Sequence, residues 1–260
     1  MRDIFRITVL AAFVVLVHTS CSEKIDLKLK DSEPRIVIEG WLSDKPGPYF
    51  VGVTKSRLYS ENNQFEGVPA ATVIISDDAG NRDTLIEATL AGLYQTSFIQ
   101  GTVGRTYRLD VTVEGTTYTS LCKMNPPVDI DSVVVTPETN FQGETELEAE
   151  LYIRDPAGVR NFYRVFNVNS GNYNVYSDLL WDGKIRDLNI PDNDLASGDT
   201  LVTELWSLDE HIYTYFDQFD QNQNNFGASA APANPDPVFT PPTLGYFTAH
   251  SVKRNTLIVQ

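Results

Sequence analysis

Few side chains in this sequence have the type and spacing needed for catalysis. The histidines are His18, His211 and His250, and His18 lies in an N-terminal segment that we expect to be removed. We interpret His211 on a predicted helix, and His250 on the last predicted strand, as surface or hydrogen-bonded side chains. No G-x-S-x-G, P-loop, G-x-G-x-x-G or H-E-x-x-H motif is present. We therefore predict no catalytic residues, no cofactor and a protein that is not an enzyme.

One acidic loop has the composition of a metal site. Its carboxylates lie within residues 187–199 and are Asp187, Asp192, Asp194 and Asp199. Oxygen ligands in a loop can hold calcium. The EF-hand spacing is absent, however, and Asp and Asn also favour turns for local reasons. We predict no metal site and keep structural calcium in this loop as the alternative.

A second acidic series follows the spacing of a β-strand. Its members recur at every second position and are Glu144, Glu146, Glu148 and Glu150. A period of two places them side by side on one face of a strand, which we interpret as a solvated face. Glycoside hydrolysis needs a carboxylate pair, and no pair stands out here. A carboxylate-dependent hydrolase is therefore an alternative function only.

The N-terminus carries a targeting signal. Arg2 and Arg6 precede an apolar run over residues 7–17, and Thr19-Ser20-Cys21 follow it. A basic start, a short apolar run and small residues before a cut are typical of a secretory signal. A membrane-spanning helix needs roughly 20 apolar residues, more than this run supplies. We predict a signal peptide over residues 1–20.

Cys21 is predicted to be the lipid-attachment residue, because it follows the small residues at the expected cut. An ordinary signal peptide with an incidental cysteine is the alternative. The next residues, 21–33, are mostly charged and are predicted to form a solvated, lipid-anchored tether. Cys122 would then have no disulfide partner.

The charge of the chain excludes two classes of partner. The formal net charge is −15, whereas a nucleic-acid-binding protein needs a basic surface that displaces counterions. Attachment to anionic lipid head groups by charge is equally disfavoured. A covalent lipid on Cys21 is therefore the predicted link to the membrane.

Short alternating strands dominate the chain after the tether. The clearest pattern spans residues 106–122, where apolar residues alternate with polar ones. A two-residue loop at Glu114-Gly115 would pair Val113 with Thr116 and Tyr107 with Cys122. That register puts Cys122 on the buried face, where we expect it to be an inert, small hydrophobic residue.

The predicted fold is mostly β, with two antiparallel β-sandwich modules of the Ig-like or prealbumin-like kind. Met124-Asn125-Pro126-Pro127 interrupts the strand pattern, so we place the modules at residues 34–125 and 126–260. One short helix near residues 208–219 is predicted in the second module. Its N-terminus has the capping-box sequence Ser207-Leu208-Asp209-Glu210. Its apolar stripe is formed by Leu208, Ile212, Phe216 and Phe219.

Residues 221–243 form the longest predicted irregular loop. The segment is rich in Gln, Asn, Ala and Pro, and long ordered loops are often functional. Phe226 and Phe239 within it are candidate partner-docking residues, because exposed aromatic side chains make good interface anchors. A disordered connector is the alternative.

Several segments together resemble a known family. They are residues 34–42 (PRIVIEGWL), 92–94 (GLY), 101–109 (GTVGRTYRL), 161–164 (NFYR) and 244–249 (LGYFTA). In this order and spacing the chain resembles the Bacteroidota lipoprotein family of domain of unknown function 4249. The resemblance implies an outer-membrane lipoprotein, often encoded near TonB-dependent transporters, and it supplies no catalytic residues.

The expected function follows from these observations and the resemblance. We expect a lipid-anchored outer-membrane protein that works by binding, as an accessory of a TonB-dependent transporter. A surface adhesin or glycan- or ligand-capture lipoprotein is the first alternative, and the carboxylate-dependent hydrolase is the second.

Overall fold

The computed structural model describes residues 33–57, 66–139, 143–191, 195–224 and 234–260. The chain divides into two units, Met1–Glu33 and Pro34–Gln260. The predicted signal peptide, Cys21 and nearly all of the tether lie outside the described residues. No helix in the described ranges combines the length and the apolar character needed to span a membrane.

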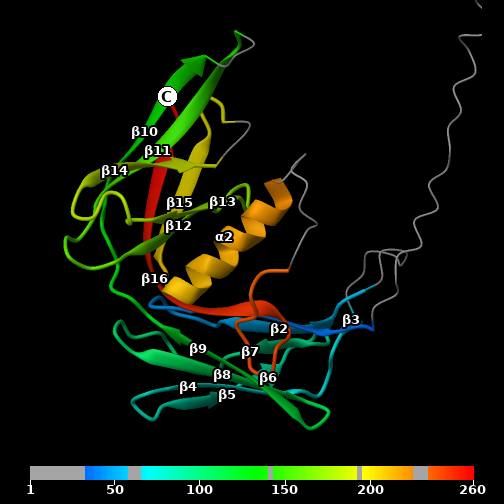
Figure 1. The fold of residues 1–260 in the computed structure, drawn as a ribbon. Coiled ribbons are helices and arrows are strands. Elements are labelled where there is room, and N and C mark those ends of the chain that lie inside the picture. The colour runs from blue at the N-terminus through cyan, green and yellow to red at the C-terminus, as the bar shows by residue number, and fades with distance from the viewer. Residues whose placement is uncertain (1–32, 58–65, 140–142, 192–194, 225–233) are drawn as a thin grey trace, which may run out of the picture. The chain divides into compact units, whose positions relative to one another are not determined.

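The unit Pro34–Gln260 is built from three sheets and one described helix (Figure 1). The four-stranded sheet has the order β5-β4-β8-β9, and its strands are β4 (Thr72–Asp77), β5 (Arg82–Thr84), β8 (Thr106–Val113) and β9 (Thr116–Lys123). The three-stranded sheet has the order β10-β11-β14, and its strands are β10 (Ile130–Thr139), β11 (Thr145–Arg154) and β14 (Ile185–Ile190). The mostly β, sandwich-type fold that the sequence predicts is confirmed.

The nine-stranded sheet has the order β13-β12-β15-β16-β1-β2-β7-β6, with β3 paired to β2. Its strands are β1 (Ile36–Ser43), β2 (Phe50–Lys55), β3 (Glu66–Gly67), β6 (Ile86–Glu87), β7 (Leu93–Gln95), β12 (Phe162–Asn167), β13 (Tyr173–Ser177), β15 (Thr200–Ser207) and β16 (Leu244–Ile258). β12 lies between two neighbours, as its apolar residues on both faces predict for a central strand.

The long strand β16 joins the two halves of the chain. Its first residues pair in parallel with β1, from Leu244 against Val37 to His250 against Ser43. Its later residues pair antiparallel with β15. One sheet therefore crosses the boundary that we predicted between residues 125 and 126, and Pro34–Gln260 is one compact unit rather than two separate modules.

The hydrophobic cores follow this topology rather than the predicted boundary. One cluster combines residues from both halves, among them Ile38, Val111 and Phe247. The other contains only residues from Val128 onward, such as Leu151. The second half of the chain thus contributes to both cores, which explains why the halves do not form separate domains.

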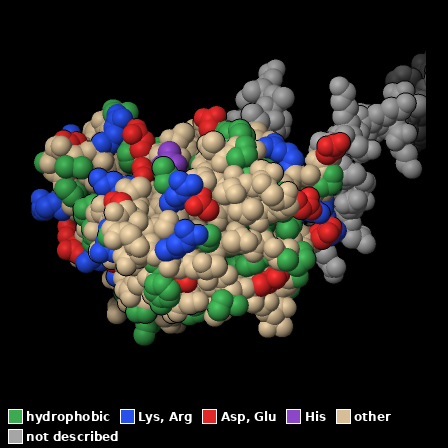
Figure 2. All heavy atoms as spheres, turned by 90° about the horizontal axis from the view of Figure 1, so that it is seen from below, with side chains coloured by type: hydrophobic (Ala, Val, Ile, Leu, Met, Phe, Trp, Pro, Cys, Tyr) green, Lys and Arg blue, Asp and Glu red, His purple; other side chains and the backbone are tan. Residues whose placement is uncertain are grey.

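Two strand predictions are confirmed in detail. β8 and β9 pair in the predicted register, including Val113 with Thr116 and Tyr107 with Cys122, and Cys122 is 1% exposed. On β11 the glutamate face is outside, while Ala149 and Leu151 are buried. In Figure 2, acidic and basic side chains are interspersed on the visible face, with hydrophobic side chains in separate groups.

The helix α2 (Glu210–Asn224) is longer than predicted and begins differently. The Asp209 carbonyl accepts the first helical hydrogen bonds, from the Ile212 and Tyr213 amides. Ser207 instead belongs to β15, and its hydroxyl has no partner among the described residues. The predicted capping box is therefore wrong, because pairing with neighbouring strands extends β15 through Ser207.

The two ends of the helix differ in burial. Leu208 and Ile212 are fully buried and Phe216 is 3% exposed, as the apolar stripe predicts, but Phe219 is 38% exposed. Residues 221–224 lie in the helix, so the predicted loop over 221–243 starts too early. The polar composition of this stretch was misleading, since a helix already begun on a buried face can extend over polar residues.

Phe239 is a core residue and not an exposed anchor. It is 2% exposed within the first core, and the adjacent Thr240 forms a bridge with Thr119 on β9. The docking role that we predicted for Phe239 is therefore wrong, because this segment packs on the four-stranded sheet. Phe226 lies outside the described residues.

We expect Phe239→Ala to lower the free energy of unfolding by about 3–5 kcal/mol, because it empties a buried aromatic site. Urea denaturation checks this value. Phe98→Ala is the matched control, since the Phe98 side chain is 70% exposed. A loss for Phe239→Ala no larger than that of the control would contradict the buried position.

Candidate ligand-binding pocket

A cavity of about 540 Å³ opens where the two halves of the nine-stranded sheet meet. Its lining comes from β1, the connection that follows β1, and strands β12, β15 and β16. The volume is in the range of pockets that hold small molecules. The cavity exists because β16 brings β1 and β15 to its two edges.

Aromatic rings form one wall of this pocket. Trp206 stacks on the His250 ring, with centroids 3.8 Å apart and planes at 10°. Trp41 lies 6.2 Å from the same ring at 28°, and Tyr49 meets Trp41 edge-on at 5.2 Å. Trp41 is 39% exposed, so part of an indole ring is available to a ligand. Indole rings provide large, rigid contact area for the flat face of a bound molecule.

Arg164 is a buried cation in the pocket lining. It sits on the central strand β12 and is 7% exposed. Its guanidinium carbon lies 3.9 Å from the Tyr173 ring centroid and 4.5 Å from each of the Trp206 and Phe216 centroids. These ring faces stabilise the charge by cation–π attraction. Burial nevertheless lowers the pKa of Arg164, although an arginine remains charged at neutral pH.

His250 also lines the pocket and is fully buried. Its Nδ1 lies 3.3 Å from the Thr248 hydroxyl, whereas its Nε2 has no partner among the described residues. Burial, with a further contribution from the Arg164 charge, holds its pKa well below 6.5, so the ring is neutral. Our prediction of a surface or fully hydrogen-bonded histidine is wrong here.

His211 lies outside this pocket and fits that prediction better. Its side chain is 40% exposed, and its Nδ1 lies 3.3 Å from the Asp209 carboxylate, although its Nε2, like that of His250, has no partner among the described residues. The structure therefore does not bring His211 and His250 together in one site.

Charged side chains surround the pocket unevenly. Among the described residues, Lys45, Arg164 and Arg254 are the cations of its lining, and Glu204 is the one carboxylate. Both oxygens of Glu204 are engaged, with Trp206 Nε1 at 2.9 Å and Arg254 Nε at 3.4 Å. Lys45 pairs with the Asp44 carboxylate at 3.1 Å. Arg164 is therefore the lining cation that no ion pair includes among the described residues.

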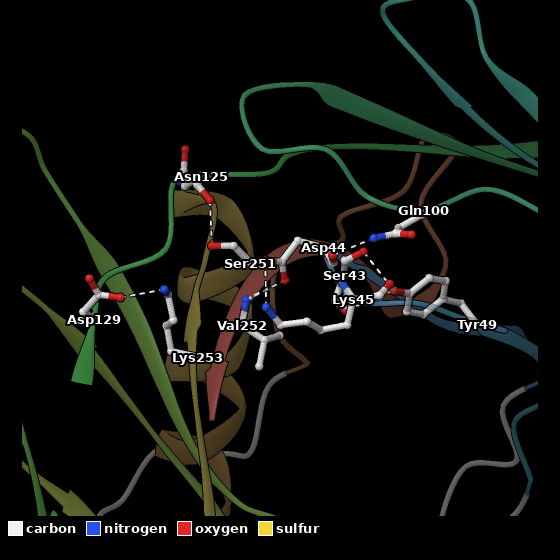
Figure 3. A network of polar contacts seen from close by, with 10 residues as sticks. All are labelled: Ser43, Asp44, Lys45, Tyr49, Gln100, Asn125, Asp129, Ser251, Val252 and Lys253. Atoms are coloured by element: carbon white, nitrogen blue, oxygen red, sulfur yellow. Dashed lines mark hydrogen bonds and ion pairs between the residues drawn. The ribbon is translucent and has the colours of Figure 1, made fainter. Parts of the chain in front are cut away.

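A polar network fixes the wall next to β1 (Figure 3). The Asp44 carboxylate accepts from the Val252 amide at 2.9 Å, and its carbonyl accepts from Gln100 Nε2 at 2.8 Å. The Tyr49 hydroxyl donates to the Ser43 carbonyl at 2.9 Å. These bonds hold the turn over residues 43–49, which contains the cis peptide Gly47-Pro48, against β16. The pocket is therefore largely preformed.

The connection between the halves is fixed in the same region. The Ser251 hydroxyl donates to the Asn125 carbonyl at 2.8 Å, and Lys253 pairs with Asp129 at 2.6 Å (Figure 3). The Pro-containing segment that we predicted as a domain linker is thus attached to β16. It helps to position the strand that lines the pocket.

Two groups of possible metal ligands lie elsewhere in the described part of the chain. One combines Asp155, Asp178 and Asp182. Each of these carboxylates accepts from a nearby backbone amide, of Gly183, Asn161 and Gly158 respectively, at 2.8–2.9 Å. We interpret the group as a support for the two loops that it joins. Sequence reasoning missed it because its members come from two separate turns.

The predicted calcium loop looks different. Asp187 lies on β14, and the Asp199 carboxylate accepts from the Ala196 amide at 2.9 Å. Asp192 and Asp194 lie outside the described residues. The described part of residues 187–199 contains no group of metal-ligating side chains.

The second group of possible ligands contains Cys122, Asp209 and His211. The Cys122 sulfur accepts from the Ala249 amide at 3.1 Å. Burial raises the pKa of the Cys122 thiol to about 12, so the thiolate needed for metal binding or attack is disfavoured.

We expect Cys122 to react slowly with a thiol reagent in the native protein. The folded pKa lies above the ordinary value, so the thiol stays protonated through the neutral range. In a Cys21→Ala background, labelling at pH 8 should be roughly 100-fold or more slower in the native than in the urea-unfolded protein. Equal rates would contradict the buried thiol.

Of the pocket residues, His250 is the one that sequence reasoning had singled out. Arg164 carries a signal that could have been used, since it is a charged residue in the middle of a strand with apolar residues on both faces. Such a charge is costly to bury without a reason. Trp41 carries no comparable local signal.

The fold is that of a mostly β, sandwich-type protein with a cavity of about 540 Å³ beside its largest sheet. A family model described as "Domain of unknown function (DUF4249)" matches residues 22–256, and the chain belongs to this family. Comparison with curated proteins finds no match.

Among solved structures, a chicken interferon gamma receptor alpha chain is similar at 10% identity, with a TM-score of 0.20. The match covers 68% of this chain and 90% of that one. Similarity at this level supports no conclusion about function.

Proposed function

We propose that the protein is a lipid-anchored binding protein of the cell envelope that holds a small ligand in this pocket without transforming it. The observation that carries the proposal is the pocket itself, of about 540 Å³, with a partly exposed Trp41 and a buried Arg164 in its lining. A preformed apolar cavity with a few convergent polar groups is the usual form of a ligand site. The lipid anchor rests on the N-terminal signal and the family resemblance.

The lining also favours binding over hydrolysis. Glycoside hydrolases use two carboxylates, and the described lining of this pocket contains only Glu204. Its bonds to Trp206 and Arg254 hold it in a fixed position.

We propose a TonB-dependent outer-membrane transporter as the protein partner, to which the captured ligand is passed. The family resemblance supports this partner. Copurification from detergent-solubilised membranes tests it, and recovery of the protein without any transporter in stoichiometric amount would count against it.

Tryptophan fluorescence tests the proposed pocket. Trp41 and Trp206 line it, whereas Trp181 belongs to the second core, so a Trp181→Phe background reports on the pocket. A small-molecule extract of the native cell envelope should give a saturable change. Trp41→Ala should weaken the apparent affinity at least about tenfold, through the lost ring contact.

The matched control is Leu180→Ala, an exposed apolar residue outside the pocket lining. It should leave the titration unchanged. A titration that Trp41→Ala does not alter would place the ligand elsewhere and overturn the proposed site.

A further inference from the structure

We infer that the pocket selects ligands that carry an oxyanion on a ring, with Arg164 binding the oxyanion and Trp41 contacting the ring. This inference rests on the proposed function and names the chemical class of the ligand. The shared chemistry is a carboxylate or sulfate group attached to a sugar ring or an aromatic ring.

The first observation is that Arg164 lacks an anionic partner. Among the described residues, no ion pair includes Arg164. Its Nε is buried without a hydrogen-bond partner. A buried charge without a partner is costly to a fold, and a guanidinium fits the two oxygens of a carboxylate or phosphate. The position is therefore best explained by an anion that arrives with the ligand.

The protein's own carboxylates near Arg164 do not fill this role. Glu204 and Asp220 both act on the Arg164 charge through space. Glu204 is held by Trp206 and Arg254, and Asp220 is hydrogen-bonded to the Tyr173 hydroxyl. Tyr246 contributes a hydroxyl to Arg164, which is a neutral acceptor and does not balance the charge.

The second observation is the balance of charge in the pocket lining. Lys45 and Arg254 also line it, but each pairs with a carboxylate, Lys45 with Asp44 at 3.1 Å and Arg254 with Glu204 at 3.4 Å. The positive charge that these pairs leave uncompensated in the lining is that of Arg164, which attracts anions and repels cations. A cationic ligand would therefore be repelled by the Arg164 charge.

The third observation is the ring wall beside Arg164. The guanidinium carbon is 4.5 Å from the Trp206 centroid, and Trp206 stacks on His250, which faces Trp41. The neutral His250 adds no charge to this wall, and its Nε2 lacks a partner. A ring placed on Trp41 can thus carry an acidic substituent toward the cationic part of the pocket. A neutral ring would contact the wall but leave Arg164 unpaired.

The test compares acids with their neutral counterparts by fluorescence titration of the Trp181→Phe protein. The sugar arm uses D-galacturonate, D-galactose and D-galactose 6-sulfate. The aromatic arm uses 4-hydroxybenzoate and 4-hydroxybenzamide. In at least one arm the acid should bind at least about tenfold more tightly than the neutral compound, because Arg164 gains a charge-assisted bond. The arm that responds identifies the ring type.

Arg164→Met should remove this preference while leaving the protein folded, because an apolar side chain of similar length replaces an unpaired charge. Thermal unfolding checks the fold. Arg108→Gln is the matched control, since Arg108 is a half-exposed cation on the four-stranded sheet, and it should retain the preference.

Each other outcome overturns the inference. The inference fails if the neutral compounds bind equally or more tightly, or if no acid binds. It also fails if the preference for acids persists in Arg164→Met. These results are distinguishable from failure of the proposed function. If the envelope extract still gives a titration that depends on Trp41, the pocket binds a ligand of another class.

Discussion

Replacing Cys21 with Ala is expected to move the mature protein from the membrane fraction to the soluble fraction. The reason is that we propose the lipid on Cys21 as the membrane attachment, and buried acyl chains contribute about 0.8 kcal/mol per methylene. With a net charge of −15, the chain is repelled by anionic head groups and cannot substitute charge for lipid.

Fractionation after a high-salt wash measures this effect, with mature N-terminal sequencing to confirm that the variant is still exported and cut. Ser22→Ala is the neighbouring control and should stay in the membrane. If the cut and exported Cys21→Ala protein sediments with the membranes, the lipid-anchor proposal fails.

Replacing Gly245 with Ala is expected to destabilise the fold by roughly 4 kcal/mol or more, an exceptional loss for one methyl group. Gly245 has φ +94 where β16 pairs with β1, and a Cβ there would lie 2.0 Å from the Ile38 carbonyl oxygen. The methyl group therefore forces apart the two strands that join the halves of the chain. The pocket should be lost with this pairing.

Gly104→Ala separates this steric effect from backbone strain. Gly104 has φ +89, but a Cβ there meets no atom within 4 Å. Its loss should be only about 1–2 kcal/mol, the cost of a left-handed conformation for alanine. Urea denaturation compares the two variants, and equal losses would contradict the close β1–β16 contact.

The parts of the fold that the sequence predicts correctly are those encoded locally. The β8–β9 register follows from apolar alternation and from the two-residue loop at Glu114-Gly115, both of which have positive φ. The same reasoning placed Cys122 in the core. Residues close together in the sequence are sufficient to predict such a hairpin and its register.

The parts that it misses depend on distant pairing. Parallel pairing of Ile38 with Gly245 has no turn to mark it, since the strands belong to opposite ends of the described unit. A strand boundary such as Ser207 is likewise set by neighbours on β12 and β16 rather than by its own capping motif.

The pocket depends both on distant strand pairing and on locally unusual residues. Its residues come from four strands and the connection after β1, and the β1–β16 pairing brings β1 and this connection to the other three strands. Arg164 alone is unusual in its local sequence, as a charge within a central apolar strand. Phe239 shows the converse, because a Pro-rich context predicted exposure while packing on β9 buried it.

The most direct test of the binding proposal is a crystal structure of the mature protein soaked with the tightest-binding fraction of the native envelope extract. We predict a bound molecule in the pocket between β1 and β15, in contact with the Trp41 ring. A molecule bound at any other surface, with this pocket empty, would contradict the proposal.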